Sequence, residues 1–226
     1  MWLAIDTASD RASVAIGGPD GALAQDVIIG ARRHAAGLIP AIEACLHSAG
    51  LGYGGLEGIV LADGPGSFTG LRVGATVARA LIRVRRMPFW IAPSLLVAAA
   101  GAGAAPGETV LTLSNALRGE FFAAAYRFGG GAVETILEPA VLALPQVLER
   151  VPSPYCLAGP AAGSFGGEPT WPNAVHLLGL VGVAGGVRLV ADPGQWEPAY
   201  GRPAEAQAKW EREHGRPLAN PARASG

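Results

Sequence analysis

A glycine-rich stretch in the first third of the chain places the strongest constraint on how the chain folds. Residues 64–72 read GPGSFTGLR, after the short apolar run 59–62 and before a long segment without acidic residues. Three glycines and a proline within seven residues mark a tight connection from a strand to a helix. Because glycine also lets another backbone or a ligand approach closely, this elbow is a point where other parts of the molecule can meet.

The elbow residues could either cap the following helix or bind a phosphate. Ser67 and Thr69 are both candidates for the cap of the following helix, because a hydroxyl oxygen accepts hydrogen bonds from the first free N–H groups. The same helix N-terminus, with Gly66, Gly70 and Arg72 nearby, could attract a phosphate. Taken alone, the motif favours the structural role over the phosphate site.

Several sharper functional templates do not fit the elbow. No Lys-Ser/Thr pair follows the glycines, so the stretch is not a Walker A loop. Its spacing is G-x-G-x-x-x-G, and no acidic residue between Asp63 and Glu108 is available to hold a ribose, which argues against a dinucleotide site. Ser67 also lacks the G-x-S-x-G frame of a hydrolase nucleophile.

Composition narrows the class of protein. The chain has 226 residues, of which half are hydrophobic and 15% are charged, and its formal net charge is −1. These values indicate a folded protein with no global attraction to nucleic acid or membrane. Cys45 and Cys156 have no metal-type spacing and suit reduced thiols in the cytoplasm. Asp6 interrupts the first apolar run, which is unlike a signal peptide, and Pro93 interrupts the long apolar segment 88–105, so we expect a soluble protein.

The order of predicted elements is that of two similar α/β halves. Each half begins with three strands and a helix, which indicates a duplicated topology of the ribonuclease-H type. We place the first half at 1–106, the second at 107–201 and a polar tail, with one predicted helix at 204–214, at 202–226. The predicted strands are 2–5, 13–16, 22–28, 57–62, 89–91, 109–113, 121–128, 133–137 and 155–158. The predicted helices are 34–48, 70–84, 93–105, 145–150 and 177–190.

Two helices of the first half carry stripes of small residues. Small residues let helices approach closely, and the helix at 70–84 has more apolar circumference than one sheet can cover, so both helices are candidates for a partner surface. The residues assigned to that surface are His34, Gly37, Ala41, Ala44, Ser48, Gly70, Gly74, Val77, Ala78 and Leu81. The alternative is that the second helix is sandwiched within its own chain and that the stripes reflect an alanine-rich composition. We predict that His34 is an exposed or capping histidine, and that the arginines at 72, 79, 83 and 86 form a solvated face.

The stretch 64–74, GPGSFTGLRVG, closely resembles the signature of the TsaB (YeaZ) family. The opening MWLAIDT, the segment 34–50, the pentapeptide 118–122 and the tetrapeptide 197–200 are similar to other segments of that family, so the resemblance covers about residues 1–202. It implies the actin/Hsp70/sugar-kinase fold. It also implies a non-catalytic subunit that binds TsaD, the enzyme that transfers a threonylcarbamoyl group to adenosine 37 of tRNA.

The resemblance also sets expectations for cofactors and partners. It implies that ATP and metal are held by the partner subunits, that a TsaE-type ATPase joins the complex, and that tRNA is contacted indirectly. A homodimer is the expected alternative when TsaD is absent. In active members of the superfamily an aspartate in the place of Asp6 helps to hold Mg-phosphate, but Thr7-Ala8 follows it here instead of glycine, so a turn-forming role is favoured. One rival hypothesis is a stand-alone phosphotransferase or peptidase of the same fold. A phosphotransferase would need a second phosphate loop, for which residues 157–163 are the only candidate. A second rival is an RNA-binding module that uses the arginine row.

Overall fold

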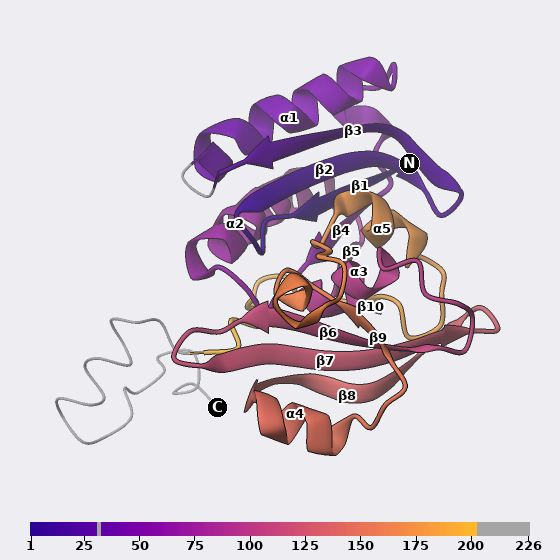
Figure 1. Cartoon of the computed structure of the whole chain (residues 1–226). Helices are drawn as coiled ribbons and strands as arrows, with labels where there is room; N and C mark the ends of the chain where they lie inside the picture. Colours follow the sequence, from indigo (N-terminus) through magenta and orange to yellow (C-terminus); the bar gives the residue numbers. More distant parts are fainter. Residues whose placement is uncertain (31–32, 203–226) are drawn as a thin grey trace, which may run out of the picture.

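The architecture comes from a computed structural model, in which residues 1–30 and 33–202 are described (Figure 1). The predicted tail helix at 204–214 lies outside the described residues.

The first sheet forms the centre of one lobe. Its six strands lie in the order β10-β5-β4-β1-β2-β3. β2 pairs antiparallel with both β1 and β3. β4 pairs parallel with both β1 and β5, as expected when helices connect the strands. The strands are β1 (Trp2–Asp6), β2 (Arg11–Gly18), β3 (Gly21–Ile29), β4 (Gly58–Ala62), β5 (Phe89–Ala92) and β10 (Arg188–Leu189).

Helices cover both faces of this sheet. On the outer face lie α1 (His34–Ser48) and α2 (Phe68–Arg85), which share a core with the sheet through residues such as Leu38, Ile42 and Ile82. A short 3₁₀ turn, η2 (Tyr53–Gly55), follows α1. On the inner face lie α3 (Ser94–Ala100) and α5 (Ala174–Gly179), which fill the space between the two sheets (Figure 1).

The second sheet forms the other lobe and repeats the same topology. Its strands lie in the order β8-β7-β6-β9, with three antiparallel strands, then α4 (Leu144–Arg150), then β9 parallel to β6. The first sheet is built the same way from β1, β2, β3, α1 and β4. This duplication confirms the actin/Hsp70/sugar-kinase fold class. The remaining elements are β6 (Thr109–Asn115), β7 (Glu120–Gly129), β8 (Ala132–Ala143), β9 (Cys156–Ala158) and η3 (Ala162–Phe165).

The predicted helix at 177–190 is wrong. The chain is helical only to Gly179, and it then turns through Gly182 and Gly185, both at positive φ, where a helix cannot continue. It ends in β10, which pairs antiparallel with β5 and so returns to the first sheet. Its first apolar residues, Leu177, Leu178, Leu180 and Val181, are buried between the lobes, and the apolar pattern alone does not show where the helix ends.

The predicted helix at 93–105 is shorter than expected. α3 stops at Ala100, and Gly101 follows because a side chain there would overlap the ring of His176 in α5. The boundary placed after residue 106 lies between α3 and β6, although β10 crosses back to the first lobe. Among the described residues, none of the helices combines the length and the apolarity needed to cross a membrane.

Candidate functional site

The elbow leads directly into α2, as its sequence predicts. Ser67 is the cap residue, and its Oγ accepts a hydrogen bond from the Gly70 N–H at 3.2 Å. Thr69 lies one residue inside the helix with an exposed side chain. Of the two candidate caps, Ser67 therefore has the capping role.

Replacing Ser67 by alanine should lower the free energy of unfolding by about 1 kcal/mol, because the Gly70 N–H loses its acceptor. Thr69→Ala is the matched control and should leave stability unchanged or slightly raised, because alanine is the better helix former. Urea unfolding of both variants measures the difference. Equal losses in the two variants would show that the Ser67 hydroxyl does not cap the helix.

The turn after β1 packs directly against the elbow. The Ser67 N–H donates to the Ala8 carbonyl at 2.7 Å. A side chain at Gly66 would overlap the backbone of Ala8, and one at Gly70 would overlap the carbonyl of Thr7. The elbow glycines thus permit a close approach of two backbones, in the corner between the end of β1 and the start of α2.

Asp6 is enclosed in this corner. It has no exposed surface, and its Oδ1 accepts a hydrogen bond from the Ala8 N–H at 3.1 Å, which shapes the turn. Its Oδ2 is buried without a partner among the described residues. Burial raises the pKa of Asp6 from 3.8 to about 7, although hydrogen bonds from the backbone of Ala8 and Thr7 lower it in part. A carboxyl group with no accessible atom cannot reach a ligand outside the corner.

An open cleft of about 1200 Å³ lies between the lobes, beside this corner. The turn after β1, the elbow, the turn between β6 and β7, and the loop after β9 form its walls, and Asp6 is not among the lining residues. In the last of these loops, Gly159 packs on the backbone of Leu113, while Pro160, Ala161 and Ser164 line the cleft. In the described part of the chain, no group of three His, Cys, Asp or Glu side chains is arranged to hold a metal ion.

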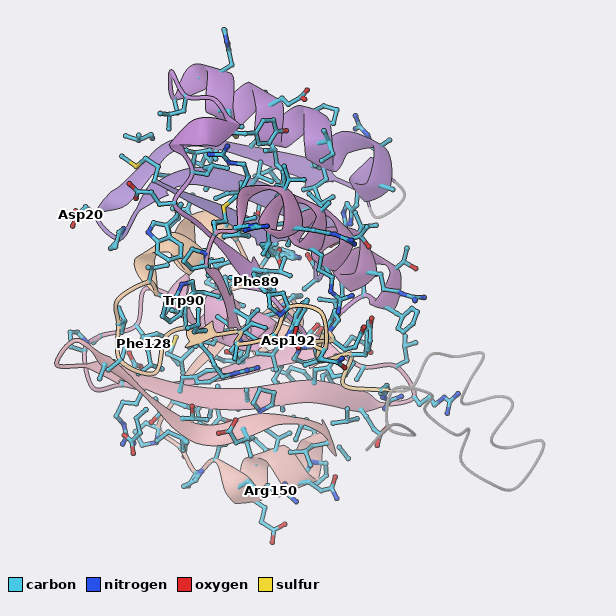
Figure 2. The ribbon with its side chains drawn as sticks, turned by 180° about the vertical axis from the view of Figure 1, so that it is seen from behind. Asp20, Phe89, Trp90, Phe128, Arg150 and Asp192 are labelled. Carbon is cyan, nitrogen blue, oxygen red and sulfur yellow. The ribbon has the colours of Figure 1, made fainter. Side chains whose placement is uncertain are left out.

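Residues 192–202, which we call the strap, cross from the first lobe to the second. Figure 2 shows Asp192, the first residue of the strap, in the loop between the lobes. Trp196 packs edge-on against Phe89 at 4.9 Å between ring centroids, and the Arg79 guanidinium of α2 donates to the Pro193 carbonyl and to Glu197, each at 3.1 Å. The strap therefore binds α2, and the arginine row of this helix is not simply solvated.

The far end of the strap lies at the rim of the cleft. The Ala199 N–H donates to the Asp63 carbonyl at 2.8 Å, and Gly201 packs tightly against Phe122 and Pro65. Arg202 then forms an ion pair with Glu120 at the start of β7. These contacts join the elbow to the second lobe.

A second, smaller hollow of about 430 Å³ lies on the outer surface between α1 and α2. We call it the helical groove. Its lining is mostly apolar, with two threonines and one arginine. The residues are Ala35, Phe68, Thr69, Arg72, Val73, Thr76 and Val77.

The small residues that the sequence assigned to a partner surface do not line the helical groove. On α2, Gly70, Gly74 and Ala78 are buried against the chain's own sheet, and a side chain at Gly74 would overlap the Thr7 hydroxyl. On α1, a side chain at Gly37 would contact Ile28 of β3, and Ala41 is only 4% exposed. Ala44 and Ser48 are exposed on that same side of the helix. The buried members of the two stripes therefore serve packing within this chain, whereas Ala44 and Ser48 remain on the surface.

Two of the assigned apolar residues do lie toward the groove. Val77 lines it, and the half-buried Leu81 follows one turn later. His34 is neither exposed nor a cap: it is 1% exposed, its Nε2 lies 3.4 Å from the Asp10 carbonyl oxygen, and the cap position belongs to Arg33. Four residues that line the groove were not predicted from the sequence. Phe68, Val73 and Thr76 lie on α2 with Val77, and Ala35 lies on α1. A helical wheel of α2 alone could have separated this face from its glycine face.

The fold and the site together define a two-lobed α/β protein in which the turn after the first strand packs on the glycine elbow. Its family follows from comparison with known proteins. Residues 28–166 match the family model of TsaD, tRNA N6-adenosine threonylcarbamoyltransferase. The chain is 31% identical over 196 residues to the tRNA threonylcarbamoyladenosine biosynthesis protein TsaB of Escherichia coli, covering 84% of this chain and 81% of that protein.

Two further relatives agree. The TsaB protein of Bacillus subtilis is 26% identical over 224 residues, which cover 92% of this chain and 96% of the relative. A Pseudomonas aeruginosa protein with similarity to peptidase YeaZ, known from its crystal structure, superposes with a TM-score of 0.74 at 26% identity, covering 89% of this chain and 99% of that one. The chain belongs to the TsaB (YeaZ) family.

Proposed function

We propose that this chain is the TsaB-type subunit of tRNA threonylcarbamoyladenosine biosynthesis and that it acts by binding a TsaD homologue, without catalysing a reaction itself. The observation that carries the proposal is the contrast between the closed corner at the elbow and the open groove on the outer face of the chain. The turn after β1 packs directly on the elbow and encloses Asp6, whereas the apolar helical groove on the outer face is open. An open apolar groove between two helices is the kind of surface that another protein's helices cover.

The proposal assigns the chemistry to the partners. The TsaD homologue transfers the threonylcarbamoyl group and, with a TsaE-type ATPase, holds the ATP and metal that the pathway needs. This chain contacts tRNA only indirectly, in the cytoplasm, and pairs with a second copy through the same groove when the TsaD homologue is absent. The rival proposal of a stand-alone phosphotransferase or peptidase is not favoured, because the Asp6 carboxyl is enclosed and cannot reach a phosphate in the cleft.

A single charge in the helical groove tests this function. Thr76 is exposed on the outer face of α2 and lines the groove, so Thr76→Glu should leave the monomer folded. Burying the new carboxylate against an apolar partner should weaken binding to the cell's own TsaD homologue by at least about tenfold. Calorimetric titration measures the affinity, and restored tRNA modification in a reconstituted complex measures the activity.

Ala44→Glu is the matched control, because it places the same side chain on an exposed helix position of α1 that lies away from the groove. It should bind the partner normally. If Ala44→Glu abolishes binding and Thr76→Glu does not, the partner uses the small-residue side of α1. If the unaltered chain does not bind the homologue at all, the proposed function is wrong.

A further inference from the structure

Phe68 belongs to both hollows of the molecule. It is the first residue of α2, it closes one end of the helical groove, and it also lines the mouth of the interlobe cleft. Its side chain remains 36% exposed, which is unusual for an aromatic ring held in a fixed position. Phe165 is also an exposed phenylalanine, but it lines the cleft and not the helical groove.

Two side chains hold the Phe68 ring in place. The Arg72 guanidinium, one turn along α2, lies 5.3 Å from the ring centroid. The Tyr200 ring packs against it with centroids 4.5 Å apart and planes at 37°. Tyr200 comes from the strap, which is itself fixed by the bond between Ala199 and Asp63 and by the packing of Gly201. A residue of the strap thus packs on the first residue of α2, which lies 132 positions earlier in the chain.

We propose that Phe68 is the anchor residue with which this chain binds its partner, and that Tyr200 is a positioning residue for that anchor. The proposal rests on the proposed function, because the partner is the TsaD homologue that covers the helical groove. Interface energy concentrates in a few central aromatic and arginine side chains that fill pockets on the partner. An exposed ring already held in one orientation loses little conformational entropy on binding, so it contributes more affinity than a mobile ring.

The geometry also specifies what the partner must offer. The ring requires an apolar pocket at the end of the groove, continuous with the surface that covers Val73 and Val77. The Arg72 guanidinium beside the ring requires a carboxylate or a carbonyl at the rim of that pocket, since it has five N–H donors and no acceptor. A helix with apolar residues and one acidic residue facing Arg72 satisfies both requirements.

Titration of the TsaD homologue with single variants tests the anchor. Phe68→Ala should weaken binding by about tenfold or more, whereas Phe165→Ala, an exposed phenylalanine of the cleft alone, should bind within twofold of the unaltered chain. Thermal unfolding of both variants, and a Phe68→Leu variant of similar volume, separate lost contact from lost folding. Partner binding that is unchanged in Phe68→Ala would overturn the proposal.

A double-mutant cycle tests the positioning role. Tyr200→Ala should weaken binding several-fold, and Tyr200→Phe, which keeps the ring and loses only the hydroxyl, should restore it. In a Phe68→Ala background Tyr200→Ala should have no further effect, because the ring it orients is gone. Equal effects of Tyr200→Ala with and without Phe68 would overturn this role. If the unaltered chain binds and the variants do not differ from it, the anchor fails while the proposed function stands; if the unaltered chain does not bind, both fail.

Discussion

Gly70→Ala should destabilise the fold by about 3 kcal/mol or more, even though alanine is the better helix former. The added methyl group would overlap the Thr7 carbonyl, a backbone atom of the turn after β1 that cannot move away by rotating a side chain. Either the turn after β1 or the start of α2 must shift, and both belong to the first lobe's core. Urea unfolding monitored by circular dichroism measures the loss.

Two other glycines calibrate the result. At Gly74 the nearest atom to an added methyl group is the Thr7 hydroxyl, a side-chain atom that can rotate, so Gly74→Ala should cost less than Gly70→Ala. At Gly52 nothing lies within 4 Å, so Gly52→Ala should be close to neutral. If Gly70→Ala were as stable as Gly52→Ala, the turn and the elbow would not be in contact.

The local elements of this fold could be predicted well from sequence because their signals are local. The helix predicted at 34–48 has those bounds in the structure, and Gly64, Gly66 and Gly70 marked the elbow before α2. The duplicated order of three strands and a helix was also visible. These features depend on periodicity, caps and turn residues within a few positions of each other.

The site was harder to predict because it depends on which side of each helix faces the sheet. A stripe of small residues indicates a close approach, but not the element that approaches. Gly37 meets Ile28 of β3, and Gly70 and Gly74 meet Thr7, so the approaching elements belong to this chain. The same argument explains why Gly74 is tolerated in the middle of a helix.

The strap could not be predicted from local pattern at all. Its contacts join residues far apart in the sequence, such as Tyr200 with Phe68 and Arg79 with Glu197. The tetrapeptide 197–200 resembles a family signature, but nothing in its composition indicates that it packs beside the elbow. Only the three-dimensional arrangement shows that Tyr200 lines the cleft and packs on Phe68, which also lines the helical groove.

The buried carboxyl of Asp6 should make this protein less stable as the pH rises. Its pKa is about 7 in the folded protein and 3.8 when exposed, so between these values the folded state holds a proton that the unfolded state has lost. Stability from this group is therefore fully present below about pH 4 and is lost as the pH rises through 7. A shift of this size corresponds to a loss on the order of 4 kcal/mol.

Asp6→Asn removes this titration while leaving an oxygen to accept the bond from Ala8. Urea unfolding at about pH 5 and about pH 8 should show a clearly smaller loss of stability in the variant than in the unaltered chain. Asp63, whose pKa burial also raises to about 7 although Arg188 opposes the shift, titrates in the same direction and gives a second, independent contribution. The double variant should therefore have the flattest profile. Parallel profiles for Asp6→Asn and the unaltered chain would mean that Asp6 is not enclosed as described, and that the corner beneath the elbow is open to solvent or to a ligand.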